Sequence, residues 1–368
     1  MKRRLSLAVV LLHLVCLSGA MAAILLCSDA TASDRGLFIA VGQNGVIVTS
    51  PDGINWVRRP HDFGHPNFEN IAYFNETFFV MGGKRGMNLS GILLTSKDAL
   101  HWARENIGRG NQYILTDMAY GKGKYVIVGN RSYSDIAYLD GIVLTSKDGH
   151  TWRDMPFERN EIPSIAFGNN VFVAMNDYLG RPGLLISGDG VIWNKTSAPG
   201  NQSNWGKVLF AKGQFVTAPT NKNKVFTSLN GLDWKEHEIA DSAGKGFAME
   251  KKNITYGDGK FIIIAKEGIV VSNDGEKWGK KTLGEIPELR DVVFGKGKYD
   301  AVAYDNYHPR GMILTSTDGE TWEGNIDYPD YLLNRVIYVD IPLSKALSTT
   351  TPQKSLYKGD KRKKPKKQ

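Results

Sequence analysis

Cysteine is almost absent from this chain of 368 residues, which has only Cys16 and Cys27, both near the N-terminus. The rest of the chain can therefore form neither an internal disulfide nor a cysteine-ligated metal site. A phosphate-binding glycine loop, a G-x-S-x-G motif and a zinc signature are absent as well. His61 and His65 are close in sequence, but two loop histidines without a third ligand are ordinary surface residues. We therefore expect no metal and no cofactor.

An excess of positive charge is also lacking outside the two ends of the chain, although the formal net charge is +8. Lys2, Arg3 and Arg4 begin the chain, and residues 345–368 contain nine lysines and arginines against a single acid, Asp360. The sequence between these ends is slightly acidic. The overall charge therefore does not indicate a nucleic-acid-binding surface, and we expect no nucleic-acid partner.

The N-terminus has the order of an export signal. Three basic residues precede the uncharged stretch Leu5–Cys27, and a small-residue cleavage pattern follows at Ala30-Thr31-Ala32. The uncharged stretch is also long enough to span a bilayer as a helix. We therefore expect residues 1–32 to be a signal peptide or, alternatively, an N-terminal membrane anchor. The protein is expected to be exported, and to be periplasmic or secreted unless the anchor is retained.

The C-terminal residues 343–368 are polar and end in the basic run Lys358–Gln368. This composition predicts a disordered tail. In an exported protein the tail is either simply solvated or in contact with anionic envelope polymers or lipid headgroups.

Repetition dominates the sequence between these ends. The motif S-x-D-G-x-x-W recurs seven times and uses seven of the eight tryptophans. We call its copies the repeat turns: Ser50–Trp56, Ser96–Trp102, Ser146–Trp152, Ser187–Trp193, Ser228–Trp234, Ser272–Trp278 and Ser316–Trp322. Successive motif tryptophans are 41–50 residues apart. A period in the forties with short β segments is typical of a propeller blade.

Each repeat contains enough β segments for one blade. A hairpin pattern such as Met118–Gly129 is followed by a third segment such as Gly141–Ser146, and the motif tryptophan begins a fourth. No segment of useful length has helical periodicity. The sequence therefore predicts an all-β fold, a seven-bladed β-propeller of four-stranded antiparallel blades over residues 35–342.

The two ends of this region complement each other. Arg35–Gly42 begins the first repeat at its second strand, and Asn334–Asp340 is a spare first strand after the last motif. Together they complete the first blade. A C-terminal strand is therefore expected to close the ring and to remove the exposed sheet edges.

The acid of the repeat turn is predicted to be structural. Gly149 can adopt a positive φ, and the Asp148 carboxylate can accept backbone N–H groups of the turn. Equivalent carboxylates at the corners of different blades cannot all line one active site. In two copies, Ala99 replaces the glycine and Asn230 replaces the aspartate, and we expect altered turn geometry there.

On these motifs, residues 35–340 resemble the Asp-box repeats of the sialidase-like propeller superfamily. The family pattern is S/T-x-D-x-G-x-x-W/F, and the form in this chain is one residue shorter. The resemblance implies an architecture far more than an activity. The chain is also similar to the seven-bladed Asp-box propeller that assists photosystem II assembly, which would imply an assembly role. The turns here lack the second glycine of that protein.

Strand order divides the loops between two faces. The loops between the second and third strands of a blade (B–C) and those between blades (D–A) share one face, and they are long and unequal. Arginines and tyrosines on this face suit an anionic, sugar-like or peptide ligand. The alternative is that they are solvated residues with local ion pairs. The candidate ligand-binding residues are Arg85, Arg131, Tyr133, Asp135, Asp177, Tyr178, Arg181, Trp205, Tyr307, His308 and Arg310.

The leading functional hypothesis is a non-catalytic binding or scaffold module that engages a protein or a glycan through the B–C/D–A face. The alternative is a glycan-active enzyme, sialidase-like or another glycosidase, on the same face. The arginine signature of sialidases is absent, and Val57–Asp62 is a poor substitute; seven blades also depart from the six of sialidases. A glycosidase needs two facing carboxylates. Several loop aspartates are available, but the sequence does not pair them, so no catalytic residue is assigned.

Overall fold

The computed structural model describes residues 35–346 with short gaps. The gaps are residues 85–89, 108–112, 133–138, 158–160, 179–180, 202–204, 220–221, 241–252, 266–267, 284–286, 306–309 and 329–331. The expected signal peptide or anchor (residues 1–32) and residues 347–368 of the expected tail lie outside the described residues. In the part of the chain that is described, no helix is long and apolar enough to cross a membrane.

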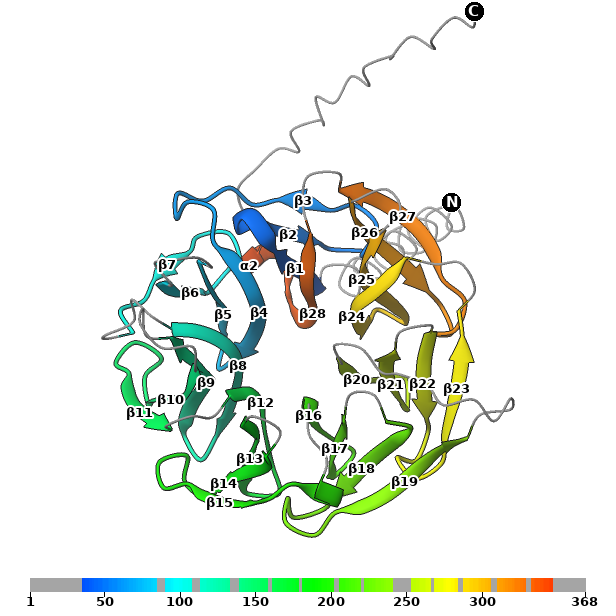
Figure 1. Cartoon of the computed structure of the whole chain (residues 1–368). Coiled ribbons are helices and arrows are strands. Elements are labelled where there is room, and N and C mark those ends of the chain that lie inside the picture. The colour runs from blue at the N-terminus through cyan, green and yellow to red at the C-terminus, as the bar shows by residue number, and fades with distance from the viewer. Residues whose placement is uncertain are drawn as a thin grey trace, which may run out of the picture.

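The described strands form five four-stranded antiparallel sheets and one eight-stranded sheet, arranged around a common centre as four-stranded blades (Figure 1). In the eight-stranded sheet, the outer strands of two neighbouring blades pair in parallel. Blade 1 has the order β28 (Leu333–Pro342), β1 (Arg35–Gly42), β2 (Ile47–Ser50) and β3 (Val57–Arg58) from the centre outward. Blades 2 to 7 follow in chain order, each beginning with its inner strand. Their strands are β4 (Asn67–Phe74), β5 (Thr77–Lys84), β6 (Ser90–Ser96), β7 (Ala103–Arg104); β8 (Tyr113–Gly121), β9 (Lys124–Ser132), β10 (Leu139–Ser146), β11 (Arg153–Phe157); β12 (Glu161–Gly168), β13 (Val171–Tyr178), β14 (Arg181–Ser187), β15 (Asn194–Ser197); β16 (Trp205–Ala211), β17 (Gln214–Pro219), β18 (Lys224–Ser228), β19 (Lys235–Ala240); β20 (Ile254–Gly257), β21 (Lys260–Ala265), β22 (Gly268–Ser272), β23 (Trp278–Thr282); and β24 (Glu288–Gly295), β25 (Lys298–Asp305), β26 (Arg310–Ser316), β27 (Glu323–Tyr328).

Three short elements complete the described fold. They are the 3-10 turns η1 (Gln43–Gly45) and η2 (Pro199–Asn201) and the one-turn helix α2 (Leu343–Ala346). The ordered body therefore extends past the expected boundary at residue 342, because Leu343 is buried in the core between blades 1 and 2.

The closing strand predicted for Asn334–Asp340 is confirmed. Strand β28 pairs antiparallel with β1, and Phe38 lies opposite Tyr338 in the register. The buried side chains of the described chain form seven apolar clusters, one between each pair of neighbouring blades. One of these lies between blades 7 and 1, where Val302 packs with Val48 and Val336. The ends of the propeller region are thus joined both by a sheet and by core packing.

The repeat turns are closed by their own side chains, as predicted. In the copy at Ser146–Trp152, Asp148 Oδ1 accepts hydrogen bonds from the backbone N–H of His150 at 2.8 Å and of Thr151 at 2.7 Å. The Ser146 hydroxyl accepts from the N–H of Gly149 at 2.8 Å, and Gly149 has a φ of 82°. Glycine adopts this conformation without steric cost, so the motif fixes the turn through local contacts alone.

The altered geometry expected at the two divergent copies is not observed. Ala99 adopts a φ of 60°, and its N–H still donates to the Ser96 hydroxyl at 2.9 Å. The side-chain oxygen of Asn230 accepts from the N–H groups of Leu232 and Asp233, both at 2.9 Å. An amide oxygen can replace a carboxylate oxygen as an acceptor, and alanine enters the left-handed region at a cost of about 1–2 kcal/mol.

Candidate functional site

In or directly before each inner strand, one polar residue at the central channel is followed by a buried apolar residue. These seven residues, which we call the inner ring, come one from each blade. They are Arg335, Asn70, Asp117, Ser164, Lys207, Asn253 and Asp291 for blades 1 to 7. The apolar residues that follow them, such as Ile71 and Val208, are buried. In several inner strands a register shift next to the ring position bends the strand, as between Phe68 and Asn70. Such bulges are a common means of re-aiming a side chain.

Asp117 joins three neighbouring blades. Its carboxylate accepts from the amide of Asn70 at 2.7 Å and from the hydroxyl of Ser164 at 2.6 Å. It also accepts from the backbone N–H of Met118 at 3.0 Å and of Ile165 at 3.1 Å. This buried carboxylate is therefore fully engaged by the donors of blades 2, 3 and 4.

The opposite side of the ring is joined in a similar way. Asp291 Oδ2 accepts from the backbone N–H of Val336 at 3.0 Å, and its other oxygen lies 3.5 Å from the guanidinium of Arg335. Arg335 also donates to the side-chain oxygen of Asn253. Arg290, the residue before Asp291, donates to Asn334 at 3.2 Å. Blades 6, 7 and 1 are thus connected through side chains at the channel.

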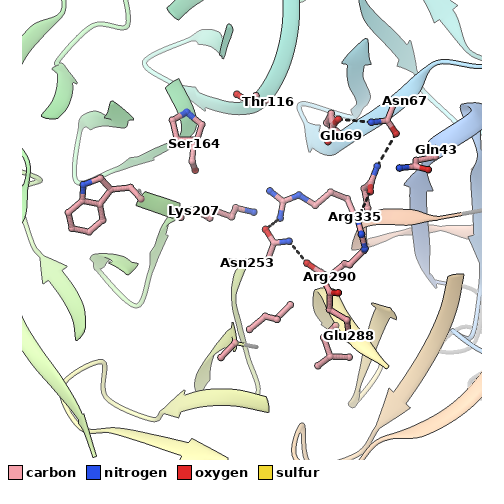
Figure 2. Close-up of a pocket in the computed structure, with 17 residues that line it drawn as sticks. Gln43, Asn67, Glu69, Thr116, Ser164, Lys207, Asn253, Glu288, Arg290 and Arg335 are labelled. Atoms are coloured by element: carbon pink, nitrogen blue, oxygen red, sulfur yellow. Dashed lines mark hydrogen bonds between the residues drawn. The ribbon is translucent and has the colours of Figure 1, made fainter. Parts of the chain in front are cut away.

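A pocket of about 430 Å³ opens at the centre of the molecule, and all seven blades contribute to its wall (Figure 2). Its wall includes the beginnings of inner strands, at Asn67, Trp205 and Glu288, and the end of a second strand, at Ala265. These strand ends meet at the B–C/D–A face. The pocket therefore lies at the middle of the B–C/D–A face, on which the sequence analysis placed the candidate ligand-binding residues.

The ionisable side chains of the pocket wall are Lys207, Arg290, Arg335, Glu69 and Glu288. Glu69 accepts a hydrogen bond from the amide of Asn67 at 2.6 Å. Burial lowers the pKa of Lys207, and the nearby charge of Arg335 lowers it further, whereas Asp117 and Asp291 act in the opposite direction. The wall can thus offer both hydrogen-bond donors and carboxylates to a ligand.

Of the candidate residues predicted from the sequence, Arg131, Trp205 and Arg310 have described side chains, and only Trp205 lines this pocket. Trp205 is 5% exposed, and its ring meets Phe226 edge-on at 5.5 Å between centroids. Arg131 lies 3.9 Å from Asp140, and Arg310 lies 3.4 Å from Asp305. For these two arginines the structure shows the local ion pairs of the alternative interpretation.

The other candidates cannot be placed in a site. Arg85, Tyr133, Asp135, Tyr307 and His308 lie outside the described residues. Asp177 and Tyr178 end β13, and Arg181 begins β14 opposite Tyr178, so their backbone lies on the expected B–C connection. The structure does not describe the side chains of these three residues.

Sequence reasoning missed the inner ring, although a signal was present. The aligned segments that begin at Ile71, Met118, Ile165, Ile254 and Val292 are each preceded by a polar residue. A polar residue at the same step of several repeats, directly before a buried position, indicates a shared environment facing the channel.

Neither metal ligation nor a histidine site is indicated in the described part of the chain. No group of three histidine, cysteine or acidic side chains there could hold a metal ion. The His61 ring nitrogen Nε2 lies 2.6 Å from the carbonyl oxygen of Gly45, and Nδ1 accepts from the N–H of Phe63 at 3.3 Å. His61 therefore fixes the loop that precedes β4.

Comparison with solved structures shows that the fold is that of β-propeller-like proteins. A structure of YCF48 bound to D1 peptide has a TM-score of 0.51 and 15% identity, with 71% of this chain and 81% of that chain covered. A putative 6-phosphogluconolactonase from Bacteroides uniformis has a TM-score of 0.60 and 12% identity, with 83% and 100% covered. A streptogramin B lyase has a TM-score of 0.54 and 10% identity, with 73% and 90% covered. At these identities the similarity concerns the fold alone.

No protein-family model matches this sequence, and no curated protein matches it.

Proposed function

We propose that this protein is an exported, non-catalytic binding propeller of the Asp-box, sialidase-like type, which engages a protein partner through its B–C/D–A face. The observation that carries the proposal is the central pocket, to which all seven blades contribute and which opens on the face with the variable loops. A rigid ring that presents unequal loops around a depression is a typical binding scaffold.

The hydrogen bonding of the ring carboxylates supports binding rather than catalysis. Asp117 accepts four hydrogen bonds from protein groups, and Asp291 is engaged by Arg335 and by the N–H of Val336. A carboxylate committed in this way holds blades together and is not available as an acid, base or nucleophile. Among proteins of this fold, YCF48 has been solved with a bound peptide, which gives a precedent for a protein partner.

The proposal is tested by capturing partners from a cell-envelope extract on the immobilised protein. A face variant carries alanine at Arg85, Arg131, Arg181 and Arg310. A matched control carries alanine at four exposed lysines of the opposite face, Lys122, Lys147, Lys277 and Lys296. We expect the control to retain the wild-type partner and the face variant to lose it. Equal recovery by both variants would overturn the assignment of the face.

The second candidate function is a glycan-active enzyme, because two carboxylates, Glu69 and Glu288, line the same pocket. A panel of aryl glycosides distinguishes the two proposals. The binding propeller leaves every glycoside intact. Hydrolysis by the wild type that is abolished in Glu69→Gln or Glu288→Gln would instead establish the enzyme.

A further inference from the structure

Lys207 interrupts the hydrogen-bonded inner ring. Ring side chains connect blades 2 to 5 through Asn70, Asp117 and Ser164, whose hydroxyl accepts from the N–H of Val208 at 3.1 Å. On the other side, Arg335 and Asn253 connect blades 1 and 6. Lys207 Nζ, in contrast, has no hydrogen-bond or ion-pair partner among the described residues. An ammonium group that is partly withdrawn from water without an acceptor is unfavourable, so its usual acceptor is expected to come from outside the ring.

The position of Lys207 fits a ligand contact. Its side chain extends across the pocket with the amino group directed toward the side chain of Arg335 (Figure 2). Lys207 also lines a second cavity of about 280 Å³ that continues along the inner strands of blades 2 to 5. Lys207 therefore lies where the central pocket meets the second cavity.

The carboxylates whose charges act on Lys207 are already engaged. Asp117 is saturated by four donors, and Asp291 is paired with Arg335 and with the N–H of Val336. Two cationic side chains thus lie in the same pocket wall, and the two carboxylates whose charges act on Lys207 are committed to other donors. A negatively charged group between them would satisfy Lys207 and reduce the repulsion between the two cations.

We propose that Lys207 is the recognition residue of the pocket, and that its amino group binds an anionic group of the ligand, a carboxylate or a phosphate or sulfate, between Lys207 and Arg335. The inference rests on the proposed function in taking this pocket as the binding site. It adds the chemical class of the group that enters.

Binding of such an anion is expected to be coupled to proton uptake where the pH is near the pKa of Lys207. Burial and the charge of Arg335 lower that pKa in the empty pocket, whereas Asp117 and Asp291 raise it. An arriving anion favours the ammonium form. The other charged groups that face this space are Arg290, Glu69 and Glu288 on the wall, with Asp117 and Asp291 behind it. Affinity for the anion is therefore expected to fall as the pH rises through the pKa of Lys207.

The test uses sulfate and acetate as probes, because both remain ionised between about pH 6 and about pH 10. Titration calorimetry in two buffers with different ionisation enthalpies gives the affinity and the number of protons taken up. The same titration with uncharged glucose is the ligand control. A stronger response to sulfate than to acetate indicates a phosphate-like or sulfate-like group, and the reverse indicates a carboxylate.

Three variants make the result specific to Lys207. Lys207→Met is expected to weaken anion binding by on the order of tenfold or more, because one of the two facing cations is lost. Lys207→Arg is expected to bind without proton uptake and with little dependence on pH, because a guanidinium stays charged over this range. Lys147→Met, on an exposed repeat turn, is expected to behave as the wild type. Absence of saturable anion binding, or equal binding by Lys207→Met and the wild type, would overturn the inference.

The outcome also separates this inference from the proposed function. Anion binding that depends on Lys207, together with partner capture that is unchanged in the face variant, would sustain the inference and reject the face assigned to the protein partner. Partner capture that depends on the face, without anion binding, would reject the inference alone.

Discussion

The amino group of Lys298 lies 3.4 Å from the carboxylate of Asp300, whose side chain is fully buried between blades 7 and 1, where the ring closes. The corresponding strand position in the other blades is apolar, namely Ile39, Phe79, Val126, Val173, Val216 and Ile262. Neither oxygen of Asp300 accepts a hydrogen bond within the described structure. The contact between blades 7 and 1, which we call the seam, therefore contains a charged pair at a position where the other blades have apolar packing.

This pair predicts that stability falls as the pH rises from about 4 to about 7. Burial raises the pKa of Asp300 to about 7 from an ordinary 3.8; Lys298 acts against the rise and Asp52 adds to it. The folded state therefore holds a proton that the unfolded state releases above pH 3.8. This stabilisation is complete below pH 3.8 and is lost by about pH 7. The difference between the two pKa values corresponds to a change in the free energy of unfolding of roughly 4 kcal/mol at most. Denaturant unfolding from pH 5 to pH 9 measures it. The slope is expected to disappear in Asp300→Asn, and an unchanged slope there would contradict the assignment.

Asp300→Val is expected to stabilise the protein at pH 8 by roughly 1–3 kcal/mol, because a buried charge is replaced by a packed side chain. In this variant the Lys298 amino group is also expected to donate to a backbone carbonyl of the neighbouring repeat turn. At its position in other blades, Lys124 and Lys260 donate to the backbone carbonyl of the acidic residue in the next repeat turn, at 2.9 Å and 3.0 Å. The corresponding acceptor for Lys298 is the carbonyl of Asp52. Denaturant midpoints of the variant and the wild type at pH 8 provide the comparison, and a loss of stability would show that the ion pair is favourable.

The repeat turns predict a separate loss of stability in acid. Burial opposes ionisation of Asp52, but hydrogen bonds from Asn55, Ile54 and Ser50 outweigh it and hold the pKa of Asp52 at about 2. This stabilisation is present above pH 3.8 and is lost as the pH falls toward 2. Asp52→Ala is expected to cost about 1 kcal/mol at neutral pH, because the turn loses its acceptor. Thermal unfolding at pH 7 and pH 3 measures both effects.

Asp52→Asn is the matched control for that experiment. The natural Asn230 makes the same backbone hydrogen bonds in its own turn. The asparagine variant should therefore keep most of the stability at pH 7 while losing the contribution that depends on acid. If asparagine is as damaging as alanine, the charge of the aspartate matters more than its role as an acceptor.

Asp117→Ala is expected to destabilise the propeller by roughly 3 kcal/mol, because it leaves several buried donors of three blades without an acceptor. Lys207→Met, at the neighbouring ring position, removes no hydrogen bond to the described protein and should leave stability nearly unchanged. Urea unfolding of both variants makes the comparison. Equal stability of Asp117→Ala and the wild type would show that the ring does not join the blades.

Removal of strand β28 is expected to abolish cooperative unfolding. A chain that ends before Leu332 lacks the inner strand of blade 1 and exposes the edge of β1, together with core that Val336 and Val339 cover. A chain that ends after Ala346 keeps all described elements and serves as the control. Circular dichroism during heating checks both chains, and matching transitions would mean that the seam is not essential.

Local sequence determined the architecture because each blade contains its own copy of the turn motif and the strand pattern. The repeat turns close through contacts within a few residues, as Asp148 shows, so their spacing alone predicted the four-stranded blades of a propeller. The spare strand at Asn334–Asp340 predicted the closure in the same way, because an unpaired inner strand and an incomplete first blade complement each other. The one local error, at Ala99 and Asn230, arose because the backbone tolerates those side chains better than the motif suggests.

The candidate site was determined only by the tertiary structure. Successive inner-ring residues are 38–47 positions apart in the chain, and only closure of the propeller brings Lys207 opposite Arg335. Whether an arginine on a loop is available to a ligand depends in the same way on its spatial neighbours, and the structure pairs Arg131 with Asp140. Short-range hydrogen bonding can be read from a motif. The partners of a charge across the channel depend on how the whole ring closes.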